Sequence, residues 1–100
     1  MLGTSELVIT NDLSYLPAVQ AFTEEVAGQC GFSEKDRVMI LLALEEAVTN
    51  VIKHAFEDGE KATFKIIFEP KSTCLTIIVK DKGLPYEPNL VPEFNIEENL

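Results

Sequence analysis

The sequence contains no tryptophan, only two cysteines and fewer than half as many basic as acidic residues. With 8 Lys and Arg against 17 Asp and Glu, its formal net charge is −9 at pH 7. Binding to nucleic acid or to an anionic membrane through phosphate contacts needs a basic face, so this composition argues against both. An acidic protein can still bind a phosphorylated ligand when a cation screens the phosphates, and its charge favours basic protein partners.

Cysteine spacing and the lack of long apolar runs exclude further classes of protein. Cys30 and Cys74 form no CxxC pair and fit no zinc-binding spacing, so we expect buried or half-buried thiols in a reducing compartment. No apolar run reaches the roughly 18–20 residues that a membrane-spanning helix needs, and the N-terminus lacks the features of a signal peptide. Together these observations predict a cytoplasmic protein.

The length and composition are those of one folded domain. The chain has 100 residues, of which 46% are apolar and 25% are charged. We therefore expect residues 1–100 to form a single domain. A domain of this length buries only about 60–65% of the surface of its unfolded chain, so the loss of any element would matter.

Hydrophobic periodicity and capping signals predict two helices. The first begins within residues 14–17, where a proline suits the first turn, and Gly31 ends it as a C-terminal cap. The second runs from about residue 34 to residue 56 after Ser33, which begins a segment that resembles a capping box. Each helix has apolar residues three or four positions apart, as expected for a helix that packs on a core.

Strands are predicted over residues 6–10, 63–69 and 75–81. The last two alternate apolar and polar residues and are joined by a short turn, which indicates an antiparallel hairpin. Residues 84–100 contain three prolines and have weak periodicity, so we predict a loop or tail there. This order of elements predicts an α+β fold, with helices layered on one face of a mixed, mainly antiparallel sheet.

The second predicted helix carries a polar stripe opposite its apolar face. Glu46, Asn50 and His54 are four residues apart, which places them on one side of a helix. On a helical wheel, Glu46 and Asn50 each lie about 160° from Val48, which belongs to the apolar face. A solvated helix face is the ordinary explanation of such a stripe, but asparagine is a poor choice for a helix interior.

The residue types in this stripe suit metal-assisted proton transfer. The side-chain oxygen of Asn50 is a hard ligand of the kind that Mg²⁺ takes when it keeps several waters. Glu46, one turn earlier, could accept a proton from an attacking hydroxyl or orient a water molecule. The role of His54 is ambiguous, because a histidine also stabilises the C-terminal end of a helix through the helix dipole.

A second polar cluster follows the last predicted strand. Asp81, at the end of an apolar run, could accept a hydrogen bond from an exocyclic amine. Gly83 would let a flat ring approach the backbone closely. An Asp-x-Gly triplet alone is most often a turn, but together with the helix stripe it indicates a nucleotide site.

The two motifs together resemble the GHKL ATPase superfamily, which includes gyrase and the histidine kinases. Residues 46–54, Glu-x-x-x-Asn-x-x-x-His, are similar to its N-box, and residues 81–88, Asp-x-Gly-x-Pro-Tyr-x-Pro, to its first glycine box. The residues of both motifs are most similar to those of the anti-sigma factor serine kinases. The resemblance covers nearly the whole chain and implies a histidine kinase-like, Bergerat-type ATPase fold.

This resemblance implies a role for each matching residue. Glu46 would be the general base or the carboxylate that orients a water, and Asn50 would ligate a Mg²⁺ ion that bridges the phosphates of ATP. Asp81 would bind the adenine amino group, and Gly83 would give the ring room. Three further residues would lie near the cofactor: Thr49, Lys53 and His54.

The same resemblance implies partners. The phosphate would pass from ATP to a Ser or Thr of a small anti-anti-sigma protein of the STAS type, and the bound target would be a sigma factor. A homodimer is also expected, with contacts through the first strand and helix. Two alternatives stay open: a non-catalytic protein-binding module that keeps only the adenine end of the nucleotide site, and a plain α+β structural domain.

One feature departs from the family pattern. In the family, a lid and a second glycine box follow the first box and grip the phosphates, whereas no glycine occurs after Gly83 here. We therefore expect a fold that is incomplete at its C-terminal end, in a chain that is either a fragment or a truncated product.

Overall fold

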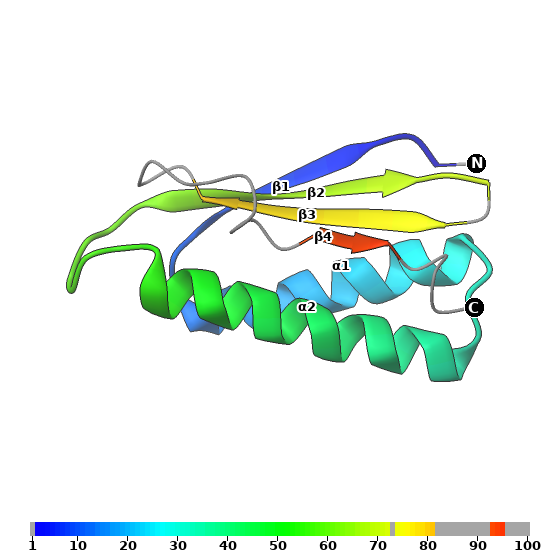
Figure 1. Ribbon diagram of the computed structural model, residues 1–100, viewed down its shortest axis with the longest axis horizontal. Helices are drawn as coiled ribbons and strands as arrows, with labels where there is room; N and C mark the ends of the chain where they lie inside the picture. The colour runs from blue at the N-terminus through cyan, green and yellow to red at the C-terminus, as the bar shows by residue number, and fades with distance from the viewer. Residues whose placement is uncertain (1, 73, 82–92, 96–100) are drawn as a thin grey trace.

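The computed structural model describes residues 2–72, 74–81 and 93–95 (Figure 1). The elements follow one another in the order β1 (Ser5–Thr10), η1 (Leu13–Tyr15), α1 (Leu16–Gln29), α2 (Glu34–His54), β2 (Thr63–Pro70), β3 (Leu75–Asp81) and β4 (Glu93–Asn95). Both α-helices lie on one face of the sheet (Figure 1), which confirms the predicted α+β class and its layering. No helix in these described ranges is long and apolar enough to cross a membrane.

The described strands form a four-stranded sheet in the order β1-β2-β3-β4, and each neighbouring pair is antiparallel. The predicted hairpin of β2 and β3 is therefore confirmed. Phe64 of β2 has Ile9 opposite it on β1 and Asp81 opposite it on β3. Because directly paired residues point to the same face of a sheet, this register decides which side chains meet the helices.

The prediction of a loop or tail over residues 84–100 is wrong for Glu93–Asn95. These three residues are β4 and pair with β3, with Phe94 opposite Ile77. A three-residue strand is too short to show an alternating pattern, and Pro92 directly before it suggested a loop. A proline just before an edge strand removes no hydrogen bond that the strand needs. The remainder of the predicted tail lies outside the described residues.

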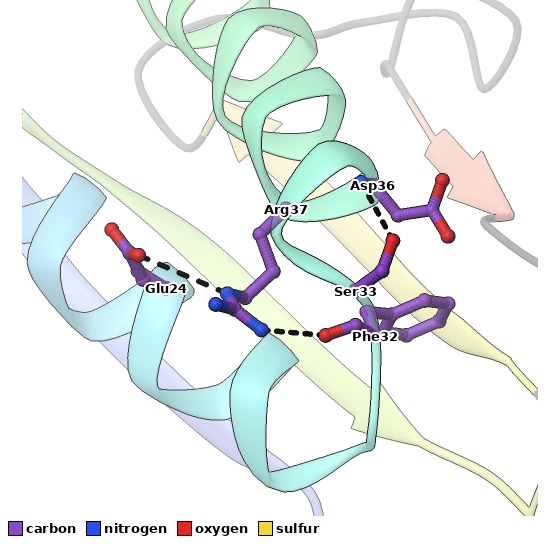
Figure 2. A network of polar contacts seen from close by, with 5 residues as sticks. All are labelled: Glu24, Phe32, Ser33, Asp36 and Arg37. Carbon is purple, nitrogen blue, oxygen red and sulfur yellow. Dashed lines mark hydrogen bonds and ion pairs between the residues drawn. The ribbon is translucent and has the colours of Figure 1, made fainter.

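Local capping signals set the helix boundaries. Gly31 follows α1 with a φ of +90°, a left-handed conformation that glycine adopts without steric cost. Ser33 is the N-cap of α2, and its hydroxyl accepts a hydrogen bond from the backbone N–H of Asp36 at 3.2 Å (Figure 2). α2 ends at His54, within the usual margin of the residue that the sequence predicts.

Arg37 ties the start of α2 to α1. Figure 2 shows its guanidinium between the two helices, with Nη1 donating to the carbonyl oxygen of Phe32 at 2.6 Å. Its Nε lies 3.8 Å from Oε1 of Glu24 on α1. A pair at this distance with an exposed carboxylate contributes little energy, so the hydrogen bond to the loop carbonyl matters more.

The core lies between the helices and the sheet. The strand residues that face the helices are buried, as their alternation predicts: Phe64, Ile66, Phe68, Leu75, Ile77 and Val79. From the helices, Leu44 and Val48 of α2 are fully buried, and Phe22 of α1 meets Phe68 edge-on with the ring centres 5.0 Å apart. This packing fixes how both helices sit on the sheet.

Two glycines three residues apart should respond oppositely to alanine. Gly31→Ala forces a residue with a Cβ into a left-handed conformation, so we expect the free energy of unfolding to fall by about 1–2 kcal/mol. In α1, a Cβ on Gly28 would meet only Cδ of Arg37 at 3.9 Å, an ordinary contact. Gly28→Ala should therefore raise the free energy of unfolding by about 0.5 kcal/mol.

Urea unfolding followed by circular dichroism measures both changes. Gly28→Ala is the matched control, because it adds the same methyl group where the backbone is helical. An equal effect of the two substitutions would contradict the capping role of Gly31.

Candidate functional site

α2 presents a polar face away from the core. Glu46 and Asn50 are exposed and lie one turn apart, and Thr49 beside them is half-buried. Leu44 and Val48 occupy the opposite side of the helix, where they are fully buried. The structure therefore brings Glu46 and Asn50 together on one surface, as the helical spacing predicts, with Thr49 beside them.

These three residues line an open hollow on α2 together with Leu42 and Glu45. The sequence reasoning missed Leu42 and Glu45. Leu42 is four residues before Glu46 and Glu45 is four residues before Thr49, and this spacing is the signal that could have found them.

The two adjacent glutamates in this hollow have different partners. Oε1 of Glu45 accepts a hydrogen bond from Nε2 of Gln20 on α1 at 2.9 Å. Glu46 makes no side-chain hydrogen bond or ion pair with the residues that the structure describes. Glu46 is therefore the carboxylate of this pair that is open to an incoming group.

Asp81 ends β3 on the helix-covered face of the sheet. It is paired with Phe64, and the Phe64 ring lies 6.4 Å from the ring of Phe56, two residues after α2. In Figure 1 this end of β3 lies over the C-terminal turns of α2. Asp81 is 8% exposed, so the structure holds a buried carboxylate at the same end of the molecule as Asn50.

Lys53 and His54 do not line the hollow of Glu46. Both are exposed in the last turn of α2, where a basic residue is stabilised by the helix dipole. Lys53 instead lines a separate hollow with Asn11 and Tyr15, on the side of the β1–α1 turn. Gly83 lies outside the described residues. The roles that the resemblance implies for these three positions stay predictions.

The donors on this face fit Mg²⁺ bound together with a nucleotide. The described residues contain no group of three or more His, Cys, Asp or Glu side chains that could hold a metal ion. Mg²⁺ commonly takes one or two protein ligands and completes its octahedron with phosphates and water. The amide oxygen of Asn50 suits that role, with the carboxylate of Glu46 one turn away.

The thiols are not candidates for a nucleophile. Cys74 is buried and Cys30 is half-buried, as the sequence predicts. Burial raises the pKa of the Cys30 thiol, and the nearby Cys74 adds to the rise. A raised pKa keeps the thiol protonated at neutral pH, and the thiolate is the reactive form.

Comparison with known proteins agrees with the fold and with the two motifs. The family model of the histidine kinase-like ATPase domain matches residues 9–99, so the chain belongs to this family. The resemblance drawn from residues 46–54 and 81–88 is thereby confirmed at the level of the family.

Curated relatives carry the name serine-protein kinase RsbW. The protein of Bacillus velezensis is 30% identical over 78 residues, which are 78% of this chain and 49% of the relative. That of Listeria monocytogenes is 37% identical over 65 residues, 62% of this chain and 40% of the relative. The protein of Halalkalibacterium halodurans is 27% identical over 84 residues, which are 84% of this chain and 51% of the relative. The chain spans about half the length of the curated relatives it matches.

We expect Asp81→Asn to weaken ATP and ADP binding by about 100-fold or more while the fold stays intact. The amide replaces one acceptor oxygen of the carboxylate by an NH2 donor, which would face either the donating adenine amine or the group that the carboxylate contacts within the protein. Calorimetric titration in the presence of Mg²⁺ measures the affinity, and circular dichroism checks the fold. Asp58→Asn, in the exposed turn after α2, is the matched control. Unchanged affinity in Asp81→Asn would remove Asp81 from the site.

Proposed function

We propose that this chain is an ATP-dependent serine/threonine protein kinase of the anti-sigma factor type. The observation that carries the proposal is the pair Glu46 and Asn50 on the exposed face of α2, with the buried carboxylate of Asp81 at the same end of the sheet. The names of the relatives, which are serine-protein kinases, support the reaction class.

Different residues would bind the adenine ring and the Mg²⁺-bound phosphates of ATP. Asp81 would accept a hydrogen bond from the adenine amine, with Gly83 leaving room for the ring. Asn50 would hold Mg²⁺ against the phosphates, and Thr49 would border the same hollow. Bound Mg²⁺-ATP supplies the phosphoryl group and neutralises the charge that develops during transfer. Lys53 and His54, in the last turn of α2, would lie near the bound nucleotide.

Glu46 would receive the proton of the accepting hydroxyl or orient it toward the phosphate. The exposure of Glu46 supports this role, because a hydroxyl on a separate protein must reach the base from solvent. A buried base would serve a small substrate that the domain encloses. The open hollow therefore favours a protein as the acceptor over a small molecule.

The partners belong to the same proposal. The acceptor would be a Ser or Thr of a small anti-anti-sigma protein of the STAS type, and the regulated partner would be a sigma factor in the cytoplasm. The net charge of −9 favours partners with basic surfaces. β1 lies at the edge of the sheet that the described strands form, so a second copy of the chain could pair with it to form the homodimer.

Glu46→Ala should abolish phosphotransfer and leave ATP affinity unchanged. Loss of a general base costs about 10²–10⁴-fold in rate, and alanine keeps the helix intact. The assay follows radiolabelled γ-phosphate from ATP to a STAS-type acceptor protein, and calorimetry measures ATP binding. Glu25→Ala is the matched control, because this exposed glutamate lies on α1 outside the hollow, where its Oε2 accepts a hydrogen bond from Gln29, and the variant should retain transfer. Wild-type transfer by Glu46→Ala would exclude Glu46 as the base.

Calorimetry of ATP and ADP with and without Mg²⁺ separates the proposal from its alternative. A kinase should bind ATP in a Mg²⁺-dependent way and transfer its phosphate. Mg²⁺-independent binding of ATP and ADP with equal affinity, without transfer, would instead indicate a regulatory module that keeps only the adenine end of the site. No binding by a folded sample would contradict the nucleotide site itself.

A further inference from the structure

An apolar patch lies on the solvent side of α2, next to Glu46. Its members Val38, Met39 and Leu42 are 51%, 50% and 62% exposed. Ile40 and Leu44, in the same stretch of helix, face the core and are buried. Single exposed apolar residues are ordinary, but Leu42 is four residues after Val38 and three after Met39, so it is the neighbour of both and joins them into one surface.

The apolar patch is continuous with the candidate site. Leu42 lines the same hollow as Glu46 and Asn50. With a rise of 1.5 Å per residue, Leu42 lies about 6 Å and Met39 about 10 Å from Glu46 along the helix axis. A chain bound over the patch would therefore extend directly to the carboxylate.

The rim of the apolar patch is acidic. The charged residues three or four positions from a member of the patch are Glu34, Lys35, Asp36, Glu45 and Glu46. Four of these five are acidic, in a chain whose net charge is −9. A partner with apolar side chains flanked by Lys or Arg matches this surface in both polarity and charge.

We propose that Val38, Met39 and Leu42 dock the polypeptide segment that carries the phosphate-accepting Ser or Thr. This inference rests on the proposed function, because it takes Glu46 as the group that meets the accepting hydroxyl. An extended chain advances about 3.3 Å per residue and turns successive side chains to opposite faces. Leu42 and Val38 lie about 6 and 12 Å from Glu46 along the helix axis, so they match the second and fourth residues from the acceptor. The segment should therefore place apolar side chains two and four positions from the accepting residue, with basic residues beside them.

Synthetic peptides test the docking without any nucleotide. The probe is a fluorescein-labelled peptide with a central Ser, Leu at the second and fourth positions from it, and flanking Lys, made in both chain directions. One matched peptide replaces the two Leu by Ser, and another replaces Lys by Glu. Fluorescence anisotropy should show that the protein binds one direction of the probe at least about tenfold more tightly than either matched peptide.

The protein variant for this test is Val38→Gln/Met39→Gln, because neither residue lines the hollow of Glu46 and Asn50. Glutamine is a good helix former, so α2 should fold normally, and circular dichroism verifies this. We expect the double variant to bind the probe at least about tenfold more weakly, with unchanged ATP affinity. Leu13→Gln is the control, because Leu13 is 43% exposed and lies in η1 rather than on α2. It should bind the probe like the wild type.

Three results from binding and assembly measurements would each overturn the docking surface: a wild type that binds no probe, a folded double variant with wild-type affinity, and a dimer that the double variant converts to monomers. Light scattering detects the last, which would make the patch a contact between two copies. Phosphotransfer measurements test the kinase proposal independently of the docking surface. Peptide binding without phosphotransfer would contradict the proposed kinase activity and support the docking surface. Phosphotransfer with equal kcat/KM for the wild type and the double variant would support the kinase activity and contradict the docking surface.

Discussion

The packing of α2 on β2 and β3 is the constraint on which the candidate site depends. Leu44 and Val48 are fully buried, so the helix can lie on the sheet in only one rotation about its axis. Each residue turns about 100° around a helix, so a shift of one residue would bring Glu45 to the position of Leu44. Burying an unpaired carboxylate is far more costly than burying a leucine. Glu46 and Asn50 face outward because Leu44 and Val48 face inward.

Asp81 occupies a position that the fold alone would give to an apolar residue. Leu75, Ile77 and Val79 point to the helices, and the alternation continues to Asp81 on the same face. A carboxylate there must be desolvated, which a hydrocarbon side chain would avoid. A buried carboxylate at this position agrees with the proposal that Asp81 recognises the nucleotide. The same reasoning does not apply to exposed polar residues such as Lys53.

Local signals in the sequence were sufficient to predict most of the fold. They could not predict the features that depend on contacts between residues far apart in the chain. Gly31 and Ser33 mark the helix ends through chemistry within a few residues of themselves, so both boundaries could be predicted. β4 could not be predicted, because a three-residue strand forms only through its pairing with β3. Within the candidate site, a four-residue spacing drifts by about 40° at each step around a helix. Glu46 and Asn50 therefore share a hollow, while His54 after a second step does not.

The apolar run over residues 38–44 explains why the docking patch was also missed. Every residue in the run is apolar, so periodicity could not separate the residues that face the core from the others. Only the structure shows that Ile40 and Leu44 satisfy the core while Val38, Met39 and Leu42 remain on the surface. Helix formation does not require apolar residues there, because Gln, Glu or Lys would support the helix equally well. Three apolar side chains beside a candidate catalytic carboxylate are therefore best explained by a second polypeptide that contacts both.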